Sequence, residues 1–137
     1  ARWRAVHEFA HRAFPRPGLA YADWHVALAD AVAGDNEAAE ARAKEIEGLA
    51  GAERYPAGPG MAAVARAVAA FERKDFDAAI SALAPVLPER ERLSGSRAQL
   101  DLLEYTLLKA YLDSGRLEDA GRLLAMRRPG PRGIPVI

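Results

Sequence analysis

Apolar residues recur along this chain every three or four positions, with charged or polar residues between them. This spacing is typical of amphipathic α-helices, and the abundance of alanine with few β-branched runs favours helix over strand. We therefore expect an all-α protein without strands. Seven helices are predicted, at residues 2–14, 19–33, 36–49, 60–73, 76–87, 96–114 and 117–127.

Proline and glycine mark the connections between the predicted helices. Residues 14–18, 51–60 and 88–95 are expected to be loops. Pro85 lies inside the helix predicted at 76–87, where it removes the backbone hydrogen bond to the Ser81 carbonyl, so this helix should kink or end early. The chain is thus expected to form one helical domain over residues 1–128, followed by an extended tail at 129–137.

A short pattern at the predicted turns occurs three times, a turn residue followed five positions later by alanine. The copies are Gly34 with Ala39, Lys74 with Ala79 in a degenerate form, and Gly115 with Ala120. The alanines are 40 and 41 residues apart. Each is expected where two helices cross closely, because a larger side chain would push the helices apart. The pattern predicts antiparallel helical hairpins stacked side by side.

Composition and charge exclude several classes of function. The 137 residues carry 19 basic and 19 acidic side chains, so no net field draws the chain to nucleic acid or to an anionic membrane. No apolar run is long enough to span a bilayer. The chain has no cysteine, which suits a reducing compartment, and we expect a cytoplasmic protein.

The third copy of the turn pattern resembles a tetratricopeptide repeat, whose length is about 34 residues. Tyr111 precedes Gly115 by four residues, and Leu124 follows Ala120 by four, as in that repeat. Glu104 stands where the repeat has a tryptophan. The resemblance implies a short α-α superhelix with divergent repeats.

Residues 2–128 also resemble the C-terminal region of the tetratricopeptide repeat protein 38 family. The segments that carry this resemblance are Arg2-Trp3, Ala22-Asp23-Trp24-His25 and residues 94–99, Ser-Gly-Ser-Arg-Ala-Gln. Members of that family are longer, so the resemblance implies that the chain is a C-terminal fragment. It carries over no catalytic residue.

One motif points to metal chemistry. His7-Glu8-Phe9-Ala10-His11 matches H-E-x-x-H, in which two histidines one helical turn apart bind zinc and the glutamate polarises a water. A third ligand would have to come from Glu37, Glu40 or another carboxylate. The alternative interpretation, which we favour, is a polar stripe facing solvent on an amphipathic helix, so no metal and no cofactor are predicted. The residues expected to face inward are then Val6, Phe9, Ala10 and Ala13.

The concave face of the predicted stack is the expected binding surface, as is usual for helical repeats. Its predicted lining consists of Tyr21, Trp24, His25, Leu28, Val64, Val68, Phe71, Tyr105 and Lys109. The helix at 96–114 is apolar nearly all round, which predicts burial on several sides. This groove either receives a protein or peptide partner, or is covered by a missing part of the same chain or by a second copy in a homodimer.

The sequence therefore favours a non-catalytic protein-interaction scaffold of tetratricopeptide type. Two enzymatic alternatives stay open. One is a metal-dependent hydrolase that uses His7, Glu8 and His11, and the other is one wall of an active site that a missing N-terminal region completes. No paired carboxylates, phosphate-binding glycine loop or Ser-His-Asp order supports an enzyme within these residues.

Overall fold

Seven α-helices and one 3₁₀ helix, η1, make up the part of the chain that the structure, a computed structural model, describes, which is residues 2–93 and 96–126. No strand occurs in this part, so the predicted all-α class is confirmed. The helices are α1 (Arg2–Ala13), α2 (Ala20–Ala33), α3 (Asn36–Gly51), α4 (Gly60–Glu72), α5 (Phe76–Leu83), η1 (Leu87–Leu93), α6 (Arg97–Asp113) and α7 (Leu117–Met126). The predicted tail at 129–137 lies outside the described residues.

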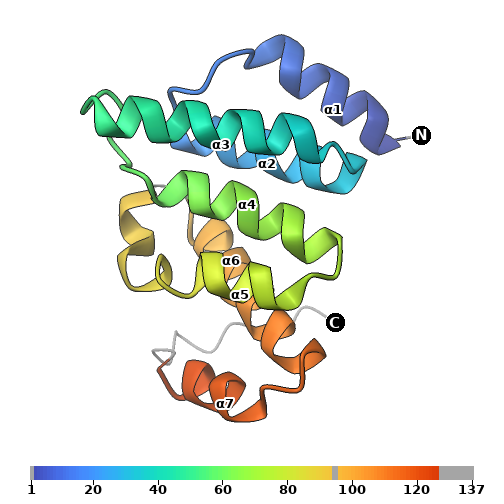
Figure 1. Cartoon of the computed structure of the whole chain (residues 1–137), viewed down its shortest axis with the longest axis vertical. Coiled ribbons are helices and arrows are strands. Elements are labelled where there is room, and N and C mark those ends of the chain that lie inside the picture. The colour runs from blue at the N-terminus through green and yellow to red at the C-terminus, as the bar shows by residue number, and fades with distance from the viewer. Residues whose placement is uncertain (1, 94–95, 127–137) are drawn as a thin grey trace.

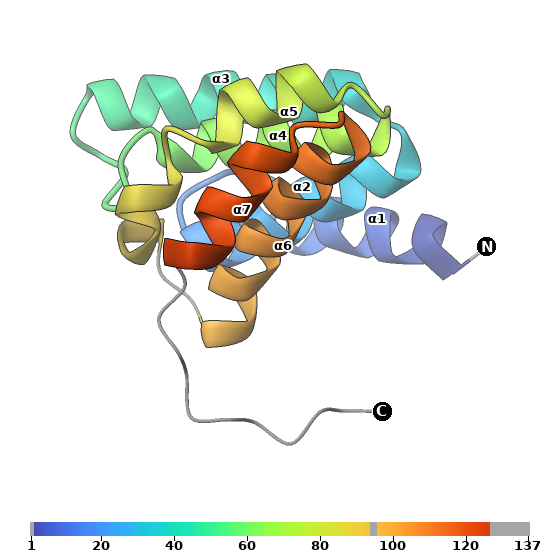
Figure 2. The same ribbon diagram turned by 90° about the horizontal axis from the view of Figure 1, so that it is seen from below.

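Helices that follow one another in the chain pack against one another, and α1 and α7 lie at opposite ends of the domain (Figure 1). Besides these sequential contacts, α2 packs on α4. Seen from below, α3 and α5 lie along one edge, while α1 and α6 lie toward the other (Figure 2). None of the described helices combines the length and the apolar character that crossing a membrane requires.

The three predicted turns share one backbone geometry. Gly34, Lys74 and Gly115 all lie in the left-handed region, with φ of 76°, 63° and 75°. The amide of the next residue in each turn donates to a carbonyl five positions back, a link that caps the end of the preceding helix. The alanines that follow, Ala39, Ala79 and Ala120, are at most 3% exposed, as expected for close helix crossings.

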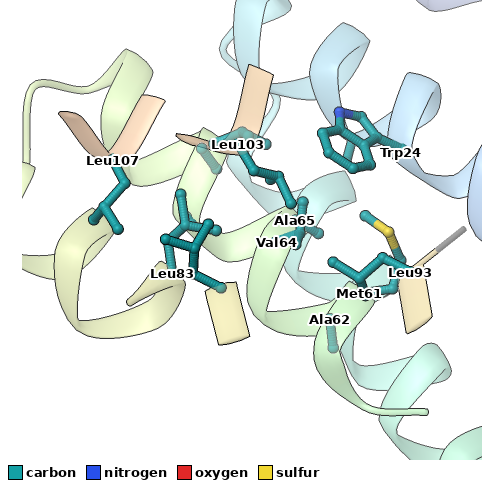
Figure 3. Packing of buried hydrophobic residues seen from close by; sticks show 14 of the residues in the cluster. Trp24, Met61, Ala62, Val64, Ala65, Leu83, Leu93, Leu103 and Leu107 are labelled. Carbon is teal, nitrogen blue, oxygen red and sulfur yellow. The ribbon is translucent and has the colours of Figure 1, made fainter. Parts of the chain in front are cut away.

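The hydrophobic core lies around α4, which is buried along most of its length. Trp24 of α2 lies beside Met61, Val64 and Ala65 of α4, and Leu103 of α6 approaches the same region (Figure 3). Gly60 begins α4 where η1 approaches it, since an added Cβ would lie only 3.1 Å from Leu93 Cδ2. The small residue there lets the two elements approach closely.

The segment around Pro85 differs in part from the prediction. As expected, the helix ends early, at Leu83 rather than at residue 87. The predicted loop over 88–95 is wrong in its first part, because Leu87–Leu93 forms the 3₁₀ helix η1. Leu87 and Leu93 are both buried, so packing of these two side chains holds a helical turn that the local proline and charges do not predict.

Candidate functional site

His7 and His11 of the H-E-x-x-H motif point at a carboxylate on the neighbouring helix. His11 Nε2 lies 2.5 Å from Asp30 Oδ1, and His7 Nε2 lies 3.2 Å from the same oxygen. The two imidazole rings are tilted, with their centroids 4.6 Å apart. One potential ligand atom from each of the three residues lies within 4.8 Å of the others. The helical turn between the histidines thus brings both of them to one point on α2.

This geometry corrects the predicted orientation of α1. His7 and His11 were expected to face solvent, but they face α2 and are only partly exposed. Phe9 and Val6 were expected to face inward, but they are 56% and 41% exposed. Ala10 alone of the predicted inward set is buried, in a small cluster with Val26 and Ala29 of α2. The assumption that the apolar side of a helix faces the core is therefore wrong for α1.

Asp30 is fully buried, which makes its charge the main electrostatic feature of the site. Burial raises the pKa of the Asp30 carboxyl, while the hydrogen bond to His11 and the charges of His11, His7 and Arg42 act in the opposite direction. Asp30 Oδ2 and His7 Nε2 are both buried and make no hydrogen bond within the described chain. Such unsatisfied polar atoms are rare in folded proteins.

Other carboxylates near the motif have separate roles. Asp35 caps α3 by accepting a hydrogen bond from the Ala38 amide through Oδ1, and its Oδ2 lies 3.4 Å from His7 Nε2. Glu40, one of the third ligands suggested by the sequence, instead pairs with Arg66. Glu37 and Glu8 are exposed. Sequence reasoning missed Asp30, although a charged residue inside the apolar stretch 20–33 is itself a signal of a buried partner.

A second buried carboxylate, Asp23, lies two helical turns before Asp30 on α2. Its Oδ1 accepts a hydrogen bond from Arg42 of α3 at 2.5 Å, and its Oδ2 accepts from the Tyr55 hydroxyl at 2.6 Å and from the Gly18 amide at 3.1 Å. Arg42 also donates to the Phe14 carbonyl. Burial, followed by the hydrogen bond to Asp23, raises the pKa of Tyr55. Both oxygens of Asp23 are thus satisfied, in contrast to those of Asp30.

The residues predicted to line a groove divide between core and surface. Trp24, Val64 and Val68 are buried, so their side chains belong to the core in this structure. Leu28 and Phe71 are partly buried against that core. The exposed members are Tyr21, His25, Tyr105 and Lys109.

Three of the exposed residues of the predicted groove lining make contacts within their own helices. Tyr21 and His25 stack edge to face on α2, with centroids 4.7 Å apart, and Lys109 pairs with Asp113 one turn further along α6. The helix predicted to be buried on several sides, α6, leaves Leu102, Tyr105 and Leu112 between 39% and 52% exposed in this chain.

A mostly apolar pocket lies elsewhere, at the end of the domain formed by η1, α6 and α7. Its volume is about 510 Å³, and its walls include Leu87, Leu107, Tyr111 and Leu123. None of the residues predicted from the sequence as site residues lines it. The pocket requires η1, which the sequence did not predict.

Comparisons with known proteins give no family. No protein-family model, no curated protein and no solved structure matches this chain. What is shown is an all-helical domain, and the resemblance to the tetratricopeptide repeat protein 38 family stays an expectation.

Proposed function

We propose that the chain is a non-catalytic protein-binding module built of stacked helical hairpins of tetratricopeptide type. Support comes from the order of packing, since α3 packs on α4 and α5 packs on α6, each joining one hairpin to the next. The left-handed turn conformation shared by Gly34, Lys74 and Gly115 agrees with a series of repeated hairpins. Proteins of this architecture act by presenting an extended surface to a partner.

The single observation that carries the proposed contact is the exposed apolar stripe of α1. Trp3, Val6 and Phe9 are spaced three residues apart, so they lie along one side of the helix, and Trp3 is 50% exposed. Large exposed aromatic side chains are enriched among residues that dominate protein–protein binding. We name Trp3, Val6 and Phe9 the α1 stripe.

Charges around the α1 stripe define the chemistry of the partner. Three exposed arginines, Arg2, Arg4 and Arg12, lie on the same helix with one exposed acidic residue, Glu8, so basic charge is in excess there. Arg12 lies over the Phe9 ring, 5.9 Å from its centroid. The partner we propose is an amphipathic helix whose apolar side packs on the α1 stripe and whose flanks are acidic.

Binding of designed helical peptides tests this proposal. Peptides with one apolar face and acidic, neutral or basic flanks are titrated against the protein, and binding is followed by fluorescence anisotropy. The acidic set should bind most tightly. A Trp3→Ala, Phe9→Ala double variant should weaken that binding by at least about thirtyfold, because losing even one aromatic anchor costs about 2 kcal/mol.

The matched control removes apolar surface from α6 instead, with Tyr105→Ala and Leu112→Ala. This variant should bind the acidic peptides as the unaltered protein does. If it loses binding while the Trp3, Phe9 variant keeps it, the surface is the groove predicted from the sequence and not the α1 stripe. If light scattering instead shows a dimer that the Trp3, Phe9 variant abolishes, the stripe is occupied by a second copy and the proposed partner is wrong.

A further inference from the structure

We propose that His7, His11 and Asp30 bind one Zn²⁺ ion, which fastens α1 to α2. The proposal is independent of the protein-binding function above. It concerns metal binding and makes no claim of hydrolysis, since Glu8, the residue that would polarise a water, is exposed.

The spacing of the three donor atoms fits a zinc ion. Zinc–nitrogen and zinc–oxygen bonds of about 2.0–2.1 Å place neighbouring ligand atoms of a tetrahedron about 3.3 Å apart. His7 Nε2 and Asp30 Oδ1 are separated by 3.2 Å. His11 Nε2 is closer to that oxygen, at 2.5 Å, so a small rotation of the partly exposed His11 ring admits the ion. The histidines are spaced i, i+4 on α1, as in zinc-binding helices, and the ligand atoms of all three residues lie within 4.8 Å of one another.

Two buried polar atoms that lack a hydrogen-bond partner in the described part of the chain support the same site, separately from the distances between the ligands. His7 Nε2 and Asp30 Oδ2 are buried, and neither has a hydrogen-bond partner among the described residues. With its proton on Nδ1, His7 offers the Nε2 lone pair to a cation, and Asp30 Oδ2 is the second oxygen of the carboxylate whose Oδ1 lies beside the histidines. Asp23, a buried carboxylate on the same helix, has partners for both of its oxygens. Of these two buried carboxylates on α2, only Asp30 has an oxygen without a hydrogen-bond partner in residues 2–93 and 96–126.

The types of ligand favour Zn²⁺ over Mg²⁺ and Ca²⁺. Two imidazole nitrogens and one carboxylate oxygen suit Zn²⁺, whereas Mg²⁺ and Ca²⁺ prefer oxygen ligands alone. A water takes the fourth position. Asp35 Oδ2, 3.4 Å from His7 Nε2, is placed at the edge of the site to accept a hydrogen bond from that water.

The ion would strengthen the attachment of α1, which includes little buried apolar contact. The fully buried apolar contact between α1 and α2 is a small cluster of Ala10, Val26 and Ala29. The larger apolar side chains of α1, Trp3 and Phe9, are at least half exposed and add little to this contact. Metal binding across the two helices therefore stabilises the folded domain, because the unfolded chain holds no such site.

Calorimetric titration of the purified, metal-stripped protein with zinc chloride tests the proposal. We expect one Zn²⁺ per chain and a rise in Tm when zinc is added. Asp30→Asn and His7→Ala should each weaken binding by more than about a hundredfold, because even the loss of an outer partner of a ligand costs about 10- to 100-fold. His25→Ala is the matched control, since His25 is the third histidine of the chain and lies outside the cluster. It should bind zinc as the unaltered protein does.

A second measurement uses the unaltered protein, so it does not depend on whether the variants fold. Histidine ring nitrogens are observed by NMR before and after zinc addition. The Nε2 resonances of His7 and His11 should shift strongly, and those of His25 should not. The proposal is overturned if zinc leaves all three histidines unchanged, if His25 shifts with the others, or if the Asp30→Asn variant is folded and binds zinc unchanged.

Discussion

At the scale of single residues, backbone conformation decides the turns. Gly34 and Gly115 adopt positive φ without cost, because glycine has no Cβ. Lys74 adopts the same conformation at φ 63° although it carries a full side chain. The sequence showed the two glycine turns directly, whereas the turn at Lys74 was recognised only from the spacing of Ala79 to the other alanines.

Replacing Lys74 by glycine should stabilise the protein. The left-handed conformation costs a non-glycine residue about 1–2 kcal/mol, and the added chain freedom of glycine in the unfolded state offsets about 0.5–1 kcal/mol of the gain. We expect the free energy of unfolding to rise by up to about 1 kcal/mol in urea titrations. Gly115→Ala is the opposite control and should destabilise by a similar amount, since its added Cβ meets no atom within 4 Å and only φ is strained. A loss of stability in Lys74→Gly would contradict this account.

At the scale of helices, ion pairs join elements that the apolar pattern alone does not pair. Arg66 of α4 forms a two-point contact with Glu40 of α3, with donor–acceptor distances of 2.8 and 3.0 Å, and also bonds Glu47. Hydrogen bonds from Arg66 lower the pKa of both glutamates. The stability this provides is present above the usual glutamate pKa of 4.5 and is lost as pH falls through the lower folded values.

Arg66→Met should therefore reduce the amount by which the free energy of unfolding falls at acid pH. Between about pH 6 and about pH 3, the unaltered protein should lose more stability than the variant, because only its glutamates take up protons that disrupt the contact. Urea midpoints measured across this range test the difference. Arg73→Met is the control, since Arg73 directly follows α4 but bonds the uncharged Asn36. Identical profiles for the Arg66 variant and the unaltered protein would exclude the ion pairs as a source of acid sensitivity.

At the scale of the whole molecule, Asp23 joins segments far apart in the chain. Through Arg42 and Tyr55 it connects α2 with α3 and with the loop before α4, and Arg42 extends the network to the end of α1. Arg42 and Asp23 are both buried, so removing either one leaves an uncompensated charge.

Arg42→Met should lower the free energy of unfolding by about 3–5 kcal/mol, the usual cost of leaving one buried charge unpaired. Tyr55→Phe should cost less, about 1.5–3 kcal/mol, because it removes one hydrogen bond to a charged group. Urea denaturation measures both. Arg16→Met provides the contrast, since Arg16 pairs with Glu45 at the surface and its loss should cost less than about 1 kcal/mol. Equal effects of the Arg42 and Arg16 changes would show that burial of the Asp23 network contributes nothing.

The sequence by itself determined the seven α-helices and most of the breaks between them, but not the 3₁₀ helix η1. Positive φ at Gly34 and termination of α5 before Pro85 follow from local sterics, so neighbouring residues suffice to predict them. Only the tertiary structure decided which side of α1 faces the domain, because a carboxylate 19 residues away, Asp30, draws His11 inward against the apolar pattern. Trp24 likewise lies in the core rather than in a groove because of how closely α2 and α4 pack, which is a matter of distance in space and not of spacing along the chain.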